Sequence, residues 1–167
     1  MKRITVFTGN GAGKTTAALG RALRAAGHGY KVVFIQFMKG RKSGEHKVKI
    51  PNLTFYQFGR EEFVKLGSPT EKDRELARKG LEHARNFLKG GVFMLVLDEA
   101  ITAVNYQLLT LNEITSFLEL VPEGMAVILT GRNVPNEILD AADLVTEMKK
   151  VKHPFDRGED AVEGCEY

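Results

Sequence analysis

The chain has 167 residues, 43% of them hydrophobic, which is enough to close one core around a central sheet. Its formal charge is +3, and basic residues are interleaved with acidic ones, so the charge does not indicate a nucleic-acid partner. Cys165 is the single cysteine, which excludes an internal disulfide and suits a reducing compartment. No apolar run approaches the roughly 20 residues that cross a bilayer. We therefore expect one domain over residues 1–167, in the cytoplasm and without a membrane partner.

Short apolar runs rich in β-branched residues alternate along the chain with longer segments of helical period. This alternation is typical of a mainly parallel sheet with helices on both faces. The pattern predicts about six strands, at Arg3–Phe7, Val32–Phe37, Leu53–Phe58, Val92–Leu97, Ala126–Leu129 and Leu144–Met148. It predicts helices at Lys14–Ala26, Thr70–Leu88, Leu111–Leu120 and Pro135–Ala141. The predicted fold class is therefore α/β, with three layers.

Two segments fit neither period, the basic stretch Lys39–Lys49 and the tail Lys152–Tyr167 with its Pro, Gly and mixed charges. Loops of an open α/β sheet gather at the carboxyl ends of the strands, where ligands bind. We interpret both segments as candidate substrate loops.

A glycine-rich loop follows the first predicted strand and opens the first predicted helix. Glycines let successive N–H groups face a phosphate, and the helix N-terminus adds the positive end of a dipole. Lys14 supplies a cation and Thr15 can ligate Mg²⁺. The loop fits the pattern G-x-x-x-x-G-K-[ST] except at its first position, which is Thr8. The sequence therefore predicts an ATP-binding, P-loop NTPase-like domain whose loop residues are Thr8, Gly9, Asn10, Gly11, Ala12, Gly13, Lys14, Thr15 and Thr16.

An acidic pair, Asp98-Glu99, ends the apolar strand predicted before it. A carboxylate at such a strand end helps to hold Mg²⁺ beside the phosphates, and a following Glu orients a water or joins the metal shell. By itself the pair is equally well explained as an acidic helix cap. Together with the P-loop it predicts a magnesium site made by Thr15, Asp98 and Glu99.

These motifs predict the nucleotide but leave the reaction open, because kinases, transferases and motors share them. A small-molecule kinase would move the terminal phosphoryl group and need an acceptor pocket near Asp98. A motor or switch module would use Glu99 to position water and the basic loop to meet a partner.

Beyond these motifs, the sequence resembles the family of ATP:corrinoid adenosyltransferases over nearly its whole length. The non-Gly first position of the P-loop is this family's own form. The other matching segments are Gly27-His28-Gly29, Gln36-Phe37, Lys39-Gly40, Val96-Leu97-Asp98-Glu99, Thr130-Gly131-Arg132, Ile138-Leu139-Asp140, Ala142-Asp143, Val151-Lys152-His153, Phe155-Asp156, Gly158, Ala161, Gly164 and Tyr167.

The resemblance implies attack by a Co(I) corrinoid on the 5′ carbon of ATP, with triphosphate leaving. A Co(I) centre carries no proton to remove, so no Ser-His or Cys-His pair is needed. Lys14 and the Asp98-Glu99 pair with Mg²⁺ are expected to neutralise the leaving group, and Arg132, at a predicted strand end, to reach the substrate. The catalytic candidates are therefore Lys14, Glu99 and Arg132. The family also suggests a homodimer and a flavoprotein reductant.

The family packs aromatic side chains where the lower axial ligand leaves cobalt. Phe63 falls where one of these aromatics lies, so it is our corrinoid-binding candidate, although Lys65 stands where longer members have a second.

The other candidate side chains have structural explanations. His28, between two glycines, is better explained as a helix cap than as a catalytic group. His153 could contact a substrate or stabilise a turn. The basic residues Lys39, Arg41, Lys42, Lys47 and Lys49 are explained first as a solvated loop, with an anionic ligand as the alternative.

Overall fold

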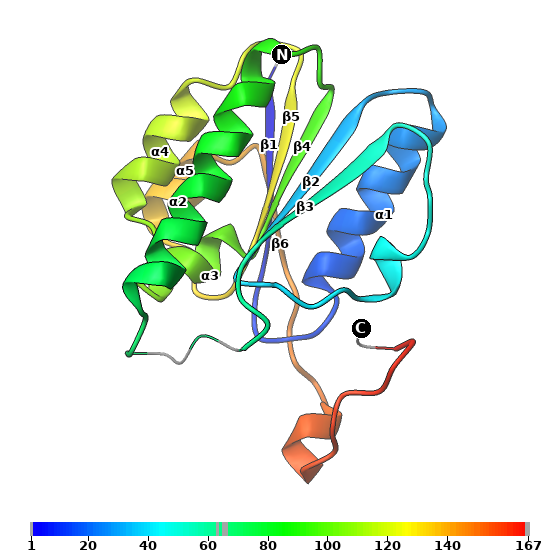
Figure 1. Ribbon diagram of the computed structural model, residues 1–167, viewed down its shortest axis with the longest axis vertical. Coiled ribbons are helices and arrows are strands. Elements are labelled where there is room, and N and C mark those ends of the chain that lie inside the picture. The colour runs from blue at the N-terminus through cyan, green and yellow to red at the C-terminus, as the bar shows by residue number, and fades with distance from the viewer. Residues whose placement is uncertain (1, 63, 65–66, 166–167) are drawn as a thin grey trace.

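Six parallel strands form the centre of the computed structural model, which describes residues 2–62, 64 and 67–165 (Figure 1). Their order across the sheet is β3-β2-β4-β5-β1-β6. The strands are β1 (Arg3–Thr8), β2 (Val32–Phe37), β3 (Leu53–Phe58), β4 (Met94–Asp98), β5 (Ala126–Thr130) and β6 (Leu144–Glu147). The predicted parallel α/β sheet is confirmed.

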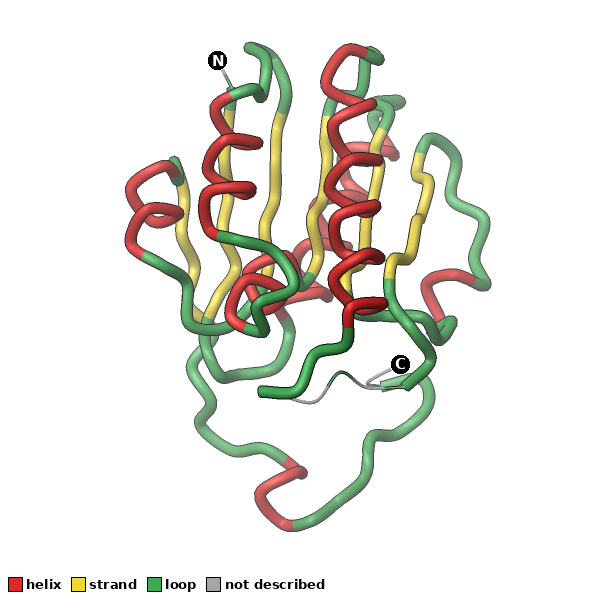
Figure 2. The backbone as a smooth tube through the Cα atoms, turned by 60° about the vertical axis from the view of Figure 1, so that its left-hand side comes forward, coloured by secondary structure: helices red, strands yellow, loops and turns green. Residues whose placement is uncertain are grey.

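Helices cover both faces of this sheet, but unequally. Figure 1 shows α1 alone on one side and α2, α3, α4 and α5 together on the other. The helices are α1 (Lys14–Gly27), α2 (Glu71–Asn86), α3 (Ala100–Asn105), α4 (Leu111–Glu119) and α5 (Asn136–Ala141). Three short 3-10 turns are η1 (Gly44–His46), η2 (Phe87–Lys89) and η3 (Pro154–Arg157). Figure 2 shows the strands side by side and the C-terminal segment looping beyond the sheet.

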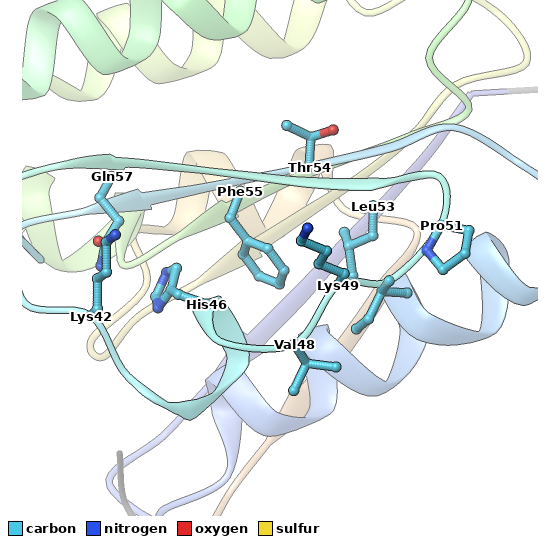
Figure 3. Close-up of a pocket in the computed structure, with 10 residues that line it drawn as sticks. Lys42, His46, Val48, Lys49, Pro51, Leu53, Thr54, Phe55 and Gln57 are labelled. Atoms are coloured by element: carbon cyan, nitrogen blue, oxygen red, sulfur yellow. The ribbon is translucent and has the colours of Figure 1, made fainter.

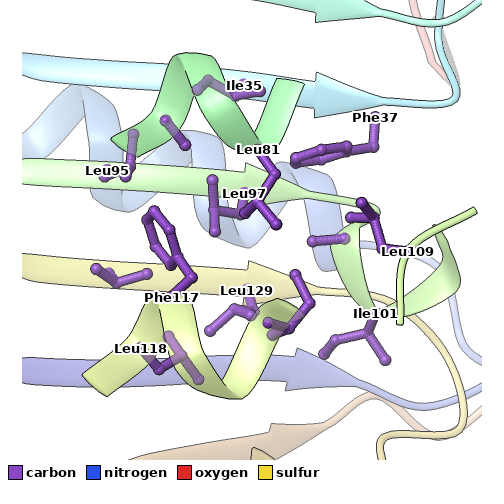
Figure 4. Packing of buried hydrophobic residues seen from close by; sticks show 14 of the residues in the cluster. Ile35, Phe37, Leu81, Leu95, Leu97, Ile101, Leu109, Phe117, Leu118 and Leu129 are labelled. Atoms are coloured by element: carbon purple, nitrogen blue, oxygen red, sulfur yellow. The ribbon is translucent and has the colours of Figure 1, made fainter. Parts of the chain in front are cut away.

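The two hydrophobic clusters follow from the alternation of side chains along each strand. Residues such as Leu95 and Leu97 of β4 face the cluster under α2–α5, which Figure 4 shows. Their neighbour Val96 belongs to the cluster under α1. On that side α1 presents the small residues Ala18, Ala22, Ala25 and Ala26, all buried. The helix can therefore pack close to this face of the sheet.

The structure differs from the sequence prediction mainly at element ends. The strand predicted at Val92–Leu97 runs from Met94 to Asp98, so that Asp98 is the last strand residue instead of the first loop residue. The helix predicted at Thr70–Leu88 begins at Glu71 because Thr70 is its N-cap, and it tightens into η2 after Asn86.

Helix α3 was not predicted. It has 6 residues, and it starts after Glu99, whose φ of 63° is left-handed and which offers no side-chain cap. A helix this short gives too few residues for a clear period. The two segments expected to be irregular each contain one short turn, η1 and η3. Among the described residues, no helix is long and apolar enough to cross a membrane.

Candidate functional site

The glycine-rich loop joins the end of β1, at Thr8, to the start of α1, at Lys14. Gly13 is the N-cap of α1, with φ 102°, and no side chain makes a capping hydrogen bond there. The first turn of α1 contains no acidic residue. The N–H groups at the start of this helix are therefore available to an anion, as a phosphate site requires.

The loop packs against the backbone that follows β6. The Gly11 N–H donates to the Met148 carbonyl oxygen at 2.6 Å. A Cβ atom added to Gly9 or Gly11 would lie 2.5 Å or 2.7 Å from the same oxygen, so only glycine fits at either position. The Met148 carbonyl group thus fixes the curvature of the loop.

The ammonium of Lys14 lies across this loop. Lys14 Nζ donates to the carbonyl oxygens of Gly9, at 2.8 Å, and Gly11, at 2.7 Å, and the residue is buried. Burial lowers the pKa of Lys14 below its ordinary value and the charge of Arg132 lowers it further, whereas Glu99 and Asp98 act in the opposite direction. The lysine is therefore held inside the loop by backbone oxygens that are weaker partners than a phosphate would be.

Asp98 is the centre of the polar contacts at the carboxyl edge of the sheet, and it is fully buried. Its Oδ1 accepts from the hydroxyls of Thr15, at 2.9 Å, and Thr130, at 2.7 Å. Its Oδ2 accepts from Gln36 Nε2, at 3.2 Å, and from Lys39 Nζ, at 2.9 Å. A buried carboxylate is stable only when it is paired and hydrogen-bonded, and these four donors meet that requirement.

Glu99 and Arg132 lie on the same edge. The Glu99 N–H donates to Thr130 Oγ1 at 2.8 Å, and the left-handed φ of Glu99 turns the chain away from the strand. Arg132 is exposed, and its carbonyl oxygen accepts from Asn105 Nδ2 at 2.6 Å. Both charges act on Lys14. The predicted candidates Lys14, Glu99 and Arg132 lie at the same edge of the sheet, just beyond the ends of β1, β4 and β5.

The interpretation of the basic loop as solvated is wrong for Lys39. Its ammonium reaches the buried Asp98, and its side chain is 34% exposed. Although burial lowers the pKa of Lys39, the charge and the hydrogen bond of Asp98 raise it above the ordinary value. Lys47, by contrast, makes an exposed ion pair with Glu163 of the tail at 3.4 Å.

Lys42 and Lys49 line a separate groove of about 580 Å³ along the edge strand β3 (Figure 3). In the figure, Phe55 of β3 and His46 of η1 point into the space between the strand and the segment that covers it. The two rings meet edge to face, with centroids 5.3 Å apart. No residue of the glycine-rich loop lines this groove.

The remaining candidates have local roles. His28 is exposed and is the C-cap of α1, as predicted. The side chain of His153 caps η3 by accepting from the Phe155 N–H at 3.2 Å, which favours the turn interpretation. Phe63 lies outside the described residues.

The oxygen atoms of Thr15 and Asp98 fit a hard divalent cation. Thr15 and Asp98 offer oxygen ligands, and an ammonium already lies beside both of them. Among the described residues, no group of three or more His, Cys, Asp or Glu side chains could hold a metal by itself. A bound phosphate would supply further oxygen ligands to a cation at this site.

Three polar residues of the site lie in segments that match the family but were not predicted as site residues: Gln36, Lys39 and Thr130. Gln36 is paired with Asp98 in the register of β2 and β4, and Thr130 ends the neighbouring strand β5. A polar residue at or near the end of an otherwise apolar strand is the sequence feature from which Gln36 and Thr130 could have been predicted as site residues.

The comparison with known proteins decides the family. The model of the family described as ATP:corrinoid adenosyltransferase BtuR/CobO/CobP matches residues 1–167. The chain belongs to this family. The corrinoid adenosyltransferase of Escherichia coli strain K12 is 41% identical to this family member over 166 residues, covering 98% of this chain and 85% of that protein. Corrinoid adenosyltransferase CobA of Salmonella typhimurium has the same identity and coverage. The corrinoid adenosyltransferase of a Sinorhizobium species is 36% identical over 171 residues, covering 98% of this chain and 79% of that protein.

Proposed function

We propose that the protein transfers the 5′-deoxyadenosyl group of ATP to the cobalt of a corrinoid and releases triphosphate. The observation that carries this proposal is the family match over residues 1–167, on a chain whose P-loop and buried Asp98 share one sheet edge. In the reaction, the electron pair of Co(I) forms the bond to the 5′ carbon. The bond from that carbon to oxygen breaks, and its electron pair leaves on the triphosphate.

The residues of the site suit the charge that develops on the leaving triphosphate. The open amides of α1 and the Lys14 ammonium are donors already held in place, which is how an enzyme stabilises a developing anion. Arg132 adds an exposed cation on the same side. We propose that Thr15, Asp98 and Glu99 hold Mg²⁺, which would neutralise phosphate charge when bound.

The test follows the corrinoid spectrum and the phosphate products together. Reduced corrinoid incubated with the protein and ATP should acquire a Co–C bond, and triphosphate should form in equal amount. Stoichiometric ADP would indicate a kinase instead, and orthophosphate as the primary product would indicate a hydrolytic motor or switch.

We further propose that Phe63 packs at the lower face of the corrin and excludes the axial ligand. The support is its place in the family pattern, in the segment between β3 and α2. Phe63→Ala should then slow adenosylation that starts from bound Co(II) corrinoid far more than adenosylation that starts from preformed Co(I). Equal losses from both cobalt states, accompanied by a lower melting temperature, would instead mean that Phe63 only stabilises the fold.

The family resemblance also supports three finer proposals: a homodimer, a flavoprotein electron donor and a cytoplasmic location. The exposed thiol of the single cysteine, Cys165, is consistent with the last of these. Sedimentation equilibrium would measure the assembly state. Reduction of bound corrinoid by a purified flavodoxin-type protein would test the electron donor.

A further inference from the structure

Lys39 supplies the one charged group among the four donors to the buried carboxylate of Asp98 in the described part of the chain. The hydroxyls of Thr15 and Thr130 and the amide of Gln36 are neutral donors. The charge of Asp98 is therefore balanced at contact distance by the Lys39 ammonium, 2.9 Å from Oδ2. Without that ammonium the buried carboxylate would keep its three neutral hydrogen-bond donors and lose both a fourth donor and its counter-charge.

The position of this ammonium matters more than its charge. Lys39 Nζ is 2.9 Å from Asp98 Oδ2 and 3.4 Å from Thr15 Oγ1. These residues are two of the three that the proposed function gives to Mg²⁺. An ammonium and a divalent cation cannot both occupy contact distance from the same two oxygens, because like charges at such separations repel strongly.

The backbone of Lys39 is fixed although its side chain is long and partly exposed. Met38 has a left-handed φ of 62°, and its N–H donates to the Phe58 carbonyl oxygen at 3.0 Å. A Cβ atom added to Gly59 would collide with the backbone of Lys39, so the two loops pack main chain against main chain. Movement at this residue is therefore confined to its side chain, which can pivot about a fixed Cα.

We infer that Lys39 is a displaceable counter-cation: it occupies the cation position between Asp98 and Thr15 until a divalent metal arrives with the nucleotide, and then swings away. This inference rests on the proposed function, because it assumes that Mg²⁺ with ATP is the incoming ligand. Lys39 is a positioning residue in this role. It pairs with the Asp98 carboxylate and keeps that side chain and Thr15 aligned, so that an incoming metal would meet a carboxylate already oriented.

The test measures how much Mg²⁺ improves ATP binding, as the ratio of the ATP dissociation constant in chelator to that in Mg²⁺, without corrinoid. In Lys39→Met no ammonium has to be displaced, so this ratio should rise roughly tenfold or more over the wild-type ratio, since one charge-assisted contact no longer competes. Lys39→Gln, which keeps a neutral donor for Asp98, should also raise the ratio and guards against loss of folding in the first variant. Lys42→Met, a nearby lysine of the same loop without a contact to Asp98, should leave the ratio unchanged.

Thermal unfolding without nucleotide gives a second readout that does not depend on ATP. In chelator, Lys39→Met should melt below the wild type, and Mg²⁺ alone should recover more of the melting temperature in the variant than it adds to the wild type. A ratio and a metal-dependent shift equal to the wild-type values would overturn the inference. So would ATP binding weakened by the same factor with and without metal, which would make Lys39 a simple phosphate clamp.

Failure of the proposed function would be visible separately. If the wild-type protein bound no ATP in either chelator or Mg²⁺, the proposal that ATP is a substrate would be wrong. The difference in Mg²⁺-dependent melting between the wild type and Lys39→Met would still decide whether Lys39 occupies a cation site.

Discussion

Thr130 links the two acidic residues of the site through a single hydroxyl. It donates to Asp98 Oδ1 at 2.7 Å and accepts from the Glu99 N–H at 2.8 Å, and it is fully buried. Thr130→Val keeps the shape but leaves a buried carboxylate oxygen and a backbone N–H short of a partner. We expect a loss of about 1 to 3 kcal/mol in the free energy of unfolding, measured with urea.

The matched control is Thr115→Val on α4, whose hydroxyl donates to the Asn112 carbonyl oxygen at 3.3 Å on the exposed surface. This change should alter the free energy of unfolding by less than about 0.5 kcal/mol. Similar losses in both variants would mean that the site hydroxyl adds nothing beyond an ordinary surface contact.

Lys14 is expected to act on rate instead of stability. Lys14→Ala removes a cation from the leaving triphosphate, and we expect turnover to fall by roughly 10² to 10³. Arg24→Ala, in the last turn of the same helix, should retain nearly full activity. Near-normal turnover of Lys14→Ala, measured by Co–C bond formation in folded protein, would contradict the proposed role.

The sequence predicted Lys14, Thr15 and Asp98 as neighbours because their motifs specify local geometry: a loop before a helix, and a carboxylate at a strand end. It did not predict Lys39 at Asp98. That contact depends on which strands are neighbours and on how they are aligned, since Gln36 pairs with Asp98 only in the register of β2 and β4. Sheet order and register depend on packing across the whole chain, so no local sequence pattern predicts them.

Helices α2 and α4 begin with capping boxes of the same kind but in different surroundings. Thr70 and Asp73 cap α2, and Thr110 and Glu113 cap α4. In α2, Arg60 also binds the acidic member, with Nε 2.7 Å from Asp73 Oδ1. The Arg60 hydrogen bond is the main reason why the pKa of Asp73 falls from 3.8 to about 2. This ion pair ties the start of the segment between β3 and α2 to the helix that ends it.

The lowered pKa sets the pH range in which this pair stabilises the protein. The folded state binds the proton less tightly than the unfolded chain, so the contribution is complete above pH 3.8 and is lost as the pH falls toward 2. At neutral pH, Asp73→Asn should reduce the free energy of unfolding by about 1 to 2 kcal/mol, and the difference from wild type should vanish near pH 2.

Glu113→Gln is the control for that measurement, because its capping box is exposed. It should lower the free energy of unfolding by less than Asp73→Asn does. An Asp73→Asn deficit that stayed constant from pH 7 to pH 2 would show that the contribution comes from shape and not from charge.

Segments bounded by clear breaks were predictable, including the six-residue helix α5, whereas the equally short helix α3 was not. The strands β2 and β3 have the predicted bounds, because both are apolar runs between clear breaks. The helix α3 depends on the turn at Glu99 and on burial of Ala100, Ile101 and Ala103 against the sheet. Burial of this kind is a tertiary property, so local propensity gave no signal for it.

The unequal distribution of helices on the two faces of the sheet determines where the site lies. The connection through α1 lies on one face, and the connections through α2–α5 lie on the other (Figure 1). The chain therefore diverges at the carboxyl edge, next to β1, and such a point leaves room for a ligand between the diverging loops. The P-loop after β1 and Asp98 at the end of β4 lie at this edge of the sheet.

The hydrogen bonds between the P-loop and Met148 couple the loop to the C-terminal segment that follows Met148. Because Gly11 N–H is bonded to Met148 O, and Met148 N–H is bonded to Thr8 O at 2.8 Å, a phosphate that steadies the loop must also steady the start of that segment. Such coupling is reciprocal. Bound ATP should therefore slow amide hydrogen exchange in residues 148–158, while exchange in residues 28–31, at the opposite end of the sheet, keeps its rate. Conversely, a chain ending at residue 149 should fold but bind ATP more weakly, because Met148, which holds the P-loop, would then lie in a frayed terminus.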